Sequence, residues 1–331
     1  MTSPADQANR QPPLIGIVGP TASGKTDLAL AIARSLSVEI LVADSRQVYR
    51  GMDIGTAKPD AAARMEVPHH LLDLAEPDEP FSVARWVVAA RSSLAEIAQR
   101  SRWPMLVGGT GLYVTSLVDG HDYASQAGVP EVRAELAARH EADGLDPLTA
   151  ELTALDPERA AGIDLRNPRR VLRALERALV EGSSPPLRAT PYAGRTVLLG
   201  LSRPRDVLYR RIDDRARRLF ERDGLLEEVR GLLERGYGPH LRPMSGHGYR
   251  EAARHLAGEW SLEEAIAVTA QRTRQYAKRQ LTWFRNDRRV RWLPAGERPA
   301  DESDLVADAV RLVRAGLSQA PAGRSTRATR T

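Results

Sequence analysis

The sequence predicts an α/β fold, in which a parallel β-sheet flanked by helices is interrupted by a helical insertion. Three observations indicate this fold. Short apolar runs that are typical of buried strands alternate with helical patterns. The first of these runs leads directly into a glycine-rich loop that opens a helix. The stretch 119–195, in contrast, has helical patterns and no convincing strand. Alternation of strands and helices implies parallel strands with helices on both faces.

The core comes from two stretches of the chain, residues 14–118 and 196–294. Strands are expected, in order, at residues 14–18, 38–43, 105–107, 197–201 and 290–293. Helices are expected at residues 27–36 and 83–98. Apolar side chains at helical spacing between residues 262 and 284 predict one buried face of a further long helix.

The stretch 119–195 is expected to form a separate helical domain inserted between two strands of the core. Its helical patterns cover residues 131–141, 147–155, 157–162 and 167–181. It ends in the turn-rich sequence GSSPPLRATPYAG at residues 182–194. Residues 1–13 and 318–331 are polar and rich in Pro, Ala, Arg and Thr, so they are predicted to be disordered tails.

Composition excludes several classes of protein. The chain has 331 residues, of which 42% are hydrophobic and 27% are charged, as is typical of a globular protein. It has no apolar run of the roughly 18 residues that a membrane span requires, and its start does not resemble a secretory signal. It has no cysteine, which excludes disulfides, zinc–thiolate sites and cysteine nucleophiles. We therefore expect a cytoplasmic protein without a membrane partner.

The charge balance gives only a weak indication of a partner. The net charge is +5 and the sequence pI is about 9.7, which favours a polyanionic partner. Arg324, Arg327 and Arg330 lie in the predicted C-terminal tail, however. The local distribution of charge is therefore more informative than the total.

Residues 19–26, GPTASGKT, match the phosphate-binding pattern G-x-x-x-x-G-K-[ST] in full. In such a P-loop, backbone N–H groups and a helix N-terminus converge on phosphate oxygens. Lys25 would neutralise the phosphate, and the Thr26 hydroxyl would bind Mg²⁺, the expected cofactor. The predicted phosphate-binding residues are Gly19, Pro20, Thr21, Ala22, Ser23, Gly24, Lys25 and Thr26. The loop predicts a P-loop NTPase-like core and nucleotide binding, such as ATP binding, but it does not name the reaction.

Asp44 follows the second predicted strand. Ligands of open parallel sheets bind beyond the carboxyl ends of the strands, where Asp44 would lie beside the phosphate-binding loop. A carboxylate there can bind Mg²⁺ or act as a general base. It can equally cap a loop by accepting hydrogen bonds from backbone N–H groups. Position alone leaves these alternatives open.

His69, His70 and Asp73 are a candidate metal set. Adjacent histidines point in different directions on a regular backbone, and no third nitrogen or sulfur ligand is evident. A structural role is therefore favoured over a metal site.

The P-loop followed by DSRQVYRGMDIGTAKP at residues 44–59 resembles the bacterial tRNA isopentenyltransferase (tRNA dimethylallyltransferase) family. Further matching motifs are PHHLLD at 68–73, GGTGLY at 108–113, NPRRVLRALE at 167–176, GYRE at 248–251 and RQLTWFRND at 279–287. Together they cover about residues 14–293.

The resemblance implies an enzyme that transfers the dimethylallyl group of dimethylallyl diphosphate to tRNA. The acceptor would be N6 of the adenosine 3′ to the anticodon, in tRNAs that read codons starting with U. The partners implied are the tRNA anticodon stem-loop and dimethylallyl diphosphate, with Mg²⁺, and we expect a monomer. The adenosine must leave its stack to react, so the two substrates should enter a channel from opposite ends.

The same resemblance assigns roles to individual residues. Lys25 and Arg215 would neutralise the leaving diphosphate, Asp44 would accept the proton of the adenosine amine, and Thr110 would position that amine. The residues that would bind tRNA are Asp44, Ser45, Arg46, Gln47, Thr110, Arg133, Arg169, Arg170, Val171, Leu172, Arg173, Gly248, Tyr249 and Arg250.

Two basic segments are candidate RNA surfaces. Arg166, Arg170, Arg173 and Arg177 have the spacing of one helix face. From the pattern alone, pairing of this face with Glu176 and Glu181 is favoured over an RNA surface, and only the resemblance points to tRNA. Residues 271–291 have eight basic side chains, which we expect to project outward toward phosphates: Arg272, Arg274, Lys278, Arg279, Arg285, Arg288, Arg289 and Arg291.

Three other functions remain as alternatives. A small-molecule or nucleotide kinase would share the fold, the P-loop and Mg²⁺. An isopentenyltransferase that acts on free adenine nucleotides would share the donor site. A non-catalytic RNA-binding module would leave Lys25, Thr26 and Asp44 unexplained.

Overall fold

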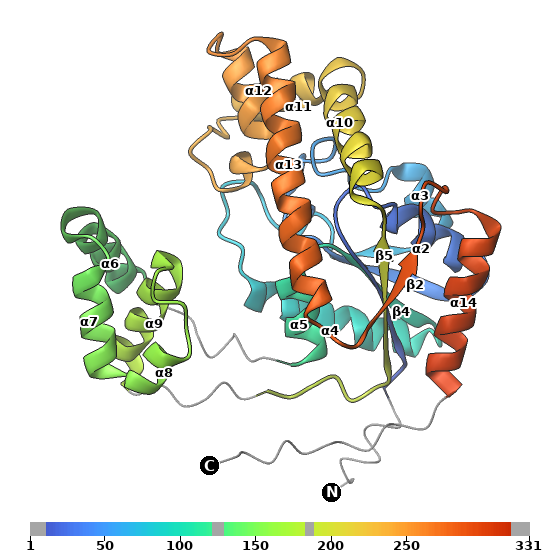
Figure 1. The fold of residues 1–331 in the computed structure, drawn as a ribbon, viewed down its shortest axis with the longest axis horizontal. Coiled ribbons are helices and arrows are strands. Elements are labelled where there is room, and N and C mark those ends of the chain that lie inside the picture. Colours follow the sequence, from blue (N-terminus) through green and yellow to red (C-terminus); the bar gives the residue numbers. More distant parts are fainter. Residues whose placement is uncertain (1–10, 121–128, 183–188, 319–331) are drawn as a thin grey trace, which may run out of the picture. The chain divides into compact units, whose positions relative to one another are not determined.

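Six parallel strands form one sheet in the order β3-β2-β4-β1-β5-β6 (Figure 1). The computed structural model describes residues 11–120, 129–182 and 189–318. The chain divides into two compact units, one of residues 1–119 with 191–331 and one of residues 120–190. The second unit falls within the predicted insertion.

The strands of the sheet are β1 (Leu14–Val18), β2 (Val38–Ala43), β3 (His69–His70), β4 (Trp103–Gly108), β5 (Thr196–Ser202) and β6 (Val290–Pro294). β1 and β2 have the predicted bounds, whereas β4, β5 and β6 extend slightly beyond theirs. β3 was not predicted from the sequence, because two residues are too few to show the alternation of a strand.

The helices around the sheet are α2 (Lys25–Ala33), α3 (Ala61–Glu66), α4 (Val83–Gln99), α5 (Gly111–Val118), α10 (Arg205–Glu221), α11 (Leu225–Glu234), α12 (Tyr249–Leu256), α13 (Leu262–Arg285) and α14 (Ser303–Ser318), with a 3₁₀ turn, η2 (Pro243–Ser245). α14 shows that the core continues well beyond residue 294, where the predicted core ended. The described part of the chain contains no helix that is long and apolar enough to cross a membrane.

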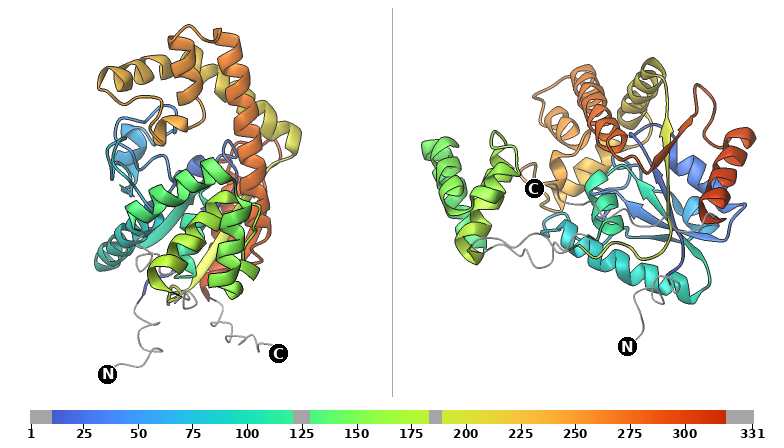
Figure 2. Two further views of the ribbon diagram at one scale, coloured as in Figure 1. Left: turned by 90° about the vertical axis from the view of Figure 1, so that its left-hand side faces the viewer. Right: turned by 60° about the horizontal axis from the view of Figure 1, so that its bottom comes forward.

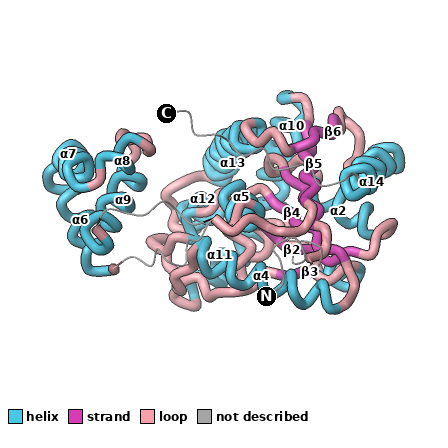
Figure 3. The backbone as a smooth tube through the Cα atoms, turned by 90° about the horizontal axis from the view of Figure 1, so that it is seen from below, coloured by secondary structure: helices cyan, strands magenta, loops and turns pink. Residues whose placement is uncertain are grey.

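Apolar side chains cover both faces of the sheet. On β1, Ile15 and Ile17 belong to one core with α2 and α14, and Leu14 and Val18 belong to a second core with α4, α5 and α10–α13. Figure 3 shows the strands between these two groups of helices. Because neither face meets solvent, every residue of β1 is buried. This explains why the strands read as continuous apolar runs.

The central strands end at the same level of the sheet. Val18 of β1 pairs with Gly108 of β4, and Gly108 pairs with Ala43 of β2. The P-loop, Asp44 and the segment that starts at Gly109 each follow one of these three strand ends. The register alone therefore places three candidate functional segments at one edge of the sheet.

The second unit is a group of four helices within its described residues, α6 (Pro130–Asp143), α7 (Asp146–Leu155), α8 (Pro157–Ala161) and α9 (Pro168–Glu181) (Figure 2). Their shared core includes Leu136, Leu148, Leu152 and Leu175. α9 begins at a cap in which Asn167 accepts a hydrogen bond from the Arg170 N–H at 3.4 Å.

Candidate active site

The P-loop connects β1 to α2, and Lys25 is the first residue of that helix. Gly24 has a φ of 98°, and a Cβ there would lie 2.5 Å from the Cβ of Ala300, so the position requires glycine. The Lys25 ammonium donates to the Pro20 carbonyl at 2.6 Å. Burial lowers the pKa of Lys25 to about 8, although the nearby Asp44 carboxylate opposes this shift. The lysine is thus held inside the loop, and its charge has little solvation.

Three arginines contact the P-loop from the segment that follows β5. Arg203 donates to the Ser23 carbonyl at 2.7 Å, and Arg211 donates to the Ala22 carbonyl at 2.9 Å. Arg215 donates to the Thr21 hydroxyl at 3.3 Å. Only Arg215 was expected here. Arg211 lies one helical turn before Arg215 on α10, so the i, i+4 spacing could have indicated that Arg211 contacts the P-loop as well.

Burial lowers the pKa of Arg215, and the charge of Asp44 opposes the shift. A guanidinium stays protonated under such a shift, so Arg215 places a positive charge in the site.

Gln280 of α13 joins two of the strand-end segments. Its Oε1 accepts from the Thr21 N–H at 2.8 Å, and its Nε2 donates to the Gly109 carbonyl at 2.9 Å. A Cβ on Gly109 would lie 2.1 Å from that Nε2, so only glycine permits the contact. Gln280 was not predicted as a site residue, although it lies within the motif RQLTWFRND.

Asp44 has the capping role that the sequence left open, and one of its oxygens stays available. Its Oδ1 accepts from the Arg46 N–H at 2.8 Å, which caps the turn after β2. Its Oδ2 has no hydrogen-bond partner in the described part of the chain. Thr110, the N-cap residue of α5, accepts from the Ser45 N–H at 3.1 Å through its hydroxyl. Asp44 and Thr110 are thus brought together by neighbouring strand ends.

Two cavities meet at Asp44. The first, of about 400 Å³, is lined by Lys25, Thr26 and other P-loop residues. The second, of about 290 Å³, is lined by Arg46, by Gly246 and His247, and by residues of α10, α12 and α13. The residues that line both are Thr21, Asp44, Thr56, Arg215 and Tyr276. Substrates bound in the two cavities would therefore meet at Asp44.

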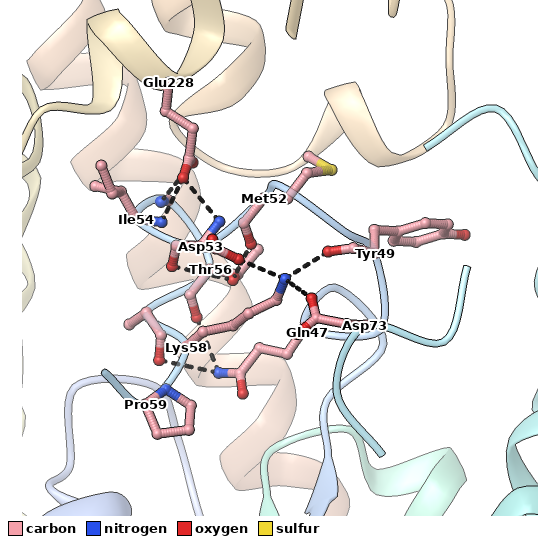
Figure 4. Close-up of polar contacts among 12 residues, drawn as sticks. Gln47, Tyr49, Met52, Asp53, Ile54, Thr56, Lys58, Pro59, Asp73 and Glu228 are labelled. Atoms are coloured by element: carbon pink, nitrogen blue, oxygen red, sulfur yellow. Dashed lines mark hydrogen bonds and ion pairs between the residues drawn. The ribbon is translucent and has the colours of Figure 1, made fainter. Parts of the chain in front are cut away.

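The loop after β2 is held from inside by Lys58 (Figure 4). The Lys58 side chain is 1% exposed, and its ammonium lies 2.6 Å from Oδ1 of Asp53, from Oδ1 of Asp73 and from the Tyr49 carbonyl oxygen. Gln47 donates from its Nε2 to the carbonyls of residues 56 and 57, at 3.0 and 3.1 Å. Lys58 has three donors and three acceptors, so its contacts are satisfied within the protein.

The same loop is held from outside by Glu228 of α11, as Figure 4 also shows. Its carboxylate accepts from the backbone N–H groups of Asp53 and Ile54, both at 2.8 Å, and from Gly55 at 3.3 Å. It also accepts from the Tyr249 hydroxyl at 2.5 Å. Gly55 and Thr56 line the second cavity, so this support shapes its wall.

Tyr249, which was expected to contact tRNA, lines the second cavity. Tyr249 is buried in the core, and its hydroxyl is bound to Glu228. Gly248, at the N-cap of α12, is buried as well. Arg250 is exposed and stays a candidate RNA contact.

The histidine pair has the structural role that the sequence favoured. His70 shares a 2.7 Å hydrogen bond with the buried Glu39, and His69 Nδ1 lies 2.7 Å from the Val67 carbonyl oxygen. Asp73 is bound to Lys58 and Arg64. Within the described ranges, no group of three or more His, Cys, Asp or Glu side chains could hold a metal ion.

Part of the predicted basic surface of residues 271–291 is paired within the protein. Arg272 lies 2.5 Å from the buried Glu251, Arg274 is bound to Asp213, and Arg289 is bound to Asp119 and Asp287. These three arginines therefore do not project freely toward a ligand, which corrects the prediction. Exposed basic side chains without a carboxylate partner among the described residues are Lys278, Arg279, Arg285, Arg288 and Arg291.

Arg46 is also engaged by the protein. Its guanidinium donates to the carbonyls of Arg242 and Pro243, at 2.6 and 3.3 Å. Ser45 and Arg46 line the second cavity, whereas Gln47 lines the first. Of the predicted tRNA-binding residues in this loop, Ser45 and Arg46 thus line the cavity that Lys25 does not line.

In the second unit, the structure corrects the predicted arginine face. Arg166 precedes α9 and pairs with Asp164, and Arg177 is buried. Arg133 and Arg173 both bind Glu176, at 3.0 and 2.7 Å, and that carboxylate is 2% exposed. The pairing with Glu176 that the charge pattern favoured is therefore present.

The remaining predicted RNA contacts of this unit differ in exposure. The Val171 side chain is 0% exposed in the core of the unit, so its expected contact with tRNA is wrong for the side chain. Leu172 packs partly against the same core. Arg169 and Arg170 are exposed and have no acidic partner in the described part of the chain. They stay candidates for contacts with phosphates.

Comparison with known proteins connects this site to one family. The family model described as IPP transferase matches residues 47–287, and one described as isopentenyl transferase matches residues 13–68. A tRNA dimethylallyltransferase from Desulforudis audaxviator is 45% identical over 290 residues, which cover 86% of this chain and 93% of the relative. Another from Syntrophobacter fumaroxidans is 46% identical over 308 residues, which cover 90% and 87%.

Solved structures agree with this result. The tRNA isopentenylpyrophosphate transferase from Bacillus halodurans has a TM-score of 0.69 at 40% identity, covering 93% of this chain and 97% of that one. A eukaryotic dimethylallyltransferase acting on tRNA has a TM-score of 0.77 at 24% identity, covering 95% and 81%, and supports the P-loop NTPase-like fold alone. The chain therefore belongs to the IPP transferase family, together with the curated tRNA dimethylallyltransferases.

Proposed function

We propose that this chain transfers the dimethylallyl group of dimethylallyl diphosphate to N6 of the adenosine 3′ to the anticodon, in tRNAs that read codons starting with U. The observation that carries the proposal is the position of Asp44, where a cavity with a P-loop meets a second cavity. The names of the relatives support tRNA as the acceptor and a prenyl group as the transferred group.

The first cavity suits a leaving diphosphate. As the bond between C1 of the donor and its oxygen breaks, negative charge grows on the diphosphate. Lys25 and Arg215 line this cavity and would stabilise that charge, together with N–H groups of the loop. Ala22 and Gly24 have positive φ angles of 61° and 98°, a backbone shape that turns successive N–H groups toward an anion.

The residues of this cavity also fit Mg²⁺. The Thr26 hydroxyl lines the cavity and has no hydrogen-bond partner among the described residues, so it is available as an oxygen ligand. Hard oxygen ligands together with substrate phosphates are what Mg²⁺ prefers. The ion, when bound, would supply further neutralisation of the diphosphate.

The second cavity suits the acceptor. The exocyclic N6 of adenosine is a weak nucleophile, because its lone pair is delocalised into the purine ring. Asp44 accepts the proton that N6 loses as its bond to C1 forms. Thr110 lies beside Asp44 through its contact with Ser45, so its hydroxyl can position the amine. The products are the N6-prenylated adenosine and diphosphate.

A polynucleotide acceptor accounts better than a free nucleotide for the surface of α13. Lys278, Arg279 and Arg285 are exposed on this helix, and Arg279 also lines the second cavity. Free adenosine monophosphate would need no basic surface outside the cavity. We propose tRNA as the acceptor on this ground, and with it a cytoplasmic location.

The test is a competition of acceptors. The protein is incubated with labelled dimethylallyl diphosphate, Mg²⁺ and either unmodified tRNA, AMP or ATP. We expect label on tRNA alone, at the adenosine 3′ to the anticodon. Label on AMP but not on tRNA would favour the adenylate isopentenyltransferase, and hydrolysis of ATP without prenylation would favour a kinase-like activity. Light scattering of the free protein tests the predicted monomer.

A further inference from the structure

The second cavity contains a pair of aromatic rings that the proposed chemistry has not used. The rings of His247 and Tyr276 have centroids 5.3 Å apart and planes inclined at 48°. Both residues line the second cavity, and Tyr276 lines the first as well. The pair therefore extends from the junction of the cavities into the acceptor side.

Tyr276 lies at the reactive end of this pair. Its hydroxyl interacts with Thr110, and Asp44 is close enough to affect its ionisation. Burial raises the pKa of Tyr276 to about 12, and the charge of Asp44 adds to the shift. The ring thus stays neutral beside the two groups that would hold the adenosine amine.

His247 lies among positive charges. Burial lowers the pKa of His247 to about 4, and the nearby guanidinium groups of Arg46, Arg279 and Arg272 lower it further. Arg46 is bound to backbone carbonyls and Arg272 is bound to Glu251. Arg279 has no acidic partner among the described residues. The imidazole is therefore neutral at physiological pH.

Neither nitrogen of His247 has a hydrogen-bond partner among the described residues. Unlike Nε2 of His69, these nitrogens are not fully buried. The ring is thus held by packing rather than by polar contacts. A neutral aromatic ring with an open side is a suitable surface for a nucleobase.

We propose that His247 and Tyr276 form an aromatic wall against which the purine of the acceptor adenosine packs. This inference rests on the proposed function. An adenine whose amine reaches Asp44 and Thr110 has its rings beside Tyr276, and its sugar lies farther out, past His247. Arg46 and Arg279 line the same cavity, so the adjoining phosphates meet positive charge. The wall makes His247 a specificity-determining residue for a flipped purine.

The test separates stacking from hydrogen bonding at one position. His247→Ala, His247→Phe and His247→Gln are compared in prenylation of an anticodon stem-loop RNA. Because a base stacked on an aromatic side chain loses that contact, the Ala variant should lose on the order of 10-fold in kcat/KM for RNA. The KM for dimethylallyl diphosphate should not change. Phe should restore most of the loss, and Gln should not.

A second readout requires no turnover. In an RNA with 2-aminopurine in place of the target adenosine, the fluorescence of the bound base is quenched when it stacks. We expect quenching with the wild type, His247→Phe and Tyr276→Phe, and less quenching with His247→Gln at saturating protein. His255→Phe is the matched control, because His255 of α12 interacts with the Trp260 carbonyl and lines neither cavity.

Two results would overturn the inference. One is wild-type kcat/KM and quenching in both His247→Ala and His247→Gln. The other is full rescue by Gln and none by Phe, which would make His247 a hydrogen-bonding residue. If the wild type prenylates no RNA, the proposed function fails instead, so the two failures are distinguishable. The Gln variant and its fluorescence keep the test valid if the Ala variant does not fold.

Discussion

The ammonium of Lys58 lies 2.6 Å from Oδ1 of Asp73, in a contact that joins the loop after β2 to the segment after β3. Lys58 lines the cavity of the P-loop, where a lysine would be expected to bind phosphate. Its three donors are instead bound to Asp53, Asp73 and the Tyr49 carbonyl. Lys58 thus stabilises the wall of the cavity, and Lys25 is the lysine that is available to the donor.

Lys58→Met should therefore lower the free energy of unfolding and have little direct effect on binding of the donor. The loss removes three hydrogen bonds of a buried ammonium, and because Asp73 is 34% exposed and keeps Arg64 as a partner, we expect a cost of about 1.5–3 kcal/mol. Chemical denaturation measures this loss. Asp53→Asn is the control, since Asp53 is 56% exposed and its pair should contribute less than about 1 kcal/mol. Equal losses in both variants would contradict the assigned role.

Gln280→Leu should weaken donor binding while leaving RNA affinity nearly unchanged. Without its amide, the Thr21 N–H and the Gly109 carbonyl lose their partners, and each unsatisfied group costs about 1–3 kcal/mol. The P-loop should then be less ordered, and we expect the KM for dimethylallyl diphosphate to rise on the order of 10-fold. Gln275→Leu, at an exposed position of the same helix, should behave as the wild type. An unchanged donor KM in Gln280→Leu would count against the link.

The strands and the P-loop could be predicted from the sequence, because each is encoded locally. β1 is an apolar run of the length of a strand, β2 is apolar except for Glu39, and the P-loop is a contiguous motif. β3 could not be predicted, since two residues have no period. α14 was left unassigned, although Leu305, Ala309 and Val313 repeat at helical spacing.

The sequence could place a residue in the candidate site only where a local motif or a strand end identified it. Lys25, Asp44 and Thr110 follow strand ends, and the register of parallel strands brings such ends together. The contacts of Gln280 with Thr21 and of Glu228 with Asp53 join segments far apart in the chain, so no local pattern reports them. The same limit explains why the hydrogen bond between Tyr249 and Glu228 was not predicted.

Asp44→Asn should remove most turnover and leave tRNA affinity nearly unchanged. An amide can still cap the turn after β2, because its oxygen can accept from the Arg46 N–H. It cannot accept the proton of the adenosine amine, so the rate of prenylation should fall by about 10²–10⁴-fold. Single-turnover kinetics and RNA filter binding test the two expectations. A large loss of RNA binding would make Asp44 a recognition residue instead.

Donor affinity should fall as the pH rises through about 8. Burial lowers the pKa of Lys25 to about 8 in the free protein, so the side chain becomes neutral above that pH. A bound diphosphate stabilises the ammonium and raises its pKa, so binding takes up a proton. Linkage then predicts a decrease of up to about tenfold in affinity per pH unit above 8. Isothermal titration calorimetry in buffers of different ionisation enthalpy measures the proton uptake. Lys25→Met should lose the dependence, and a pH-independent affinity in the wild type would contradict it.

In the second unit, the exposed and the paired arginines should differ in their effect on tRNA binding. Arg169 and Arg170 are exposed, so each can release counterions when it meets a phosphate. Alanine at either position should lower tRNA affinity and reduce the slope of log K against log salt by about 0.7–0.9 for each phosphate that is no longer neutralised. Arg173 is bound to the buried Glu176, so Arg173→Ala should lower thermal stability, by on the order of 1 kcal/mol, more than it changes that slope. Filter binding across a salt series, with a thermal melt of each variant, separates the two effects. A reduced slope in Arg173→Ala with wild-type slopes in the other two variants would place the RNA contact at the paired arginine.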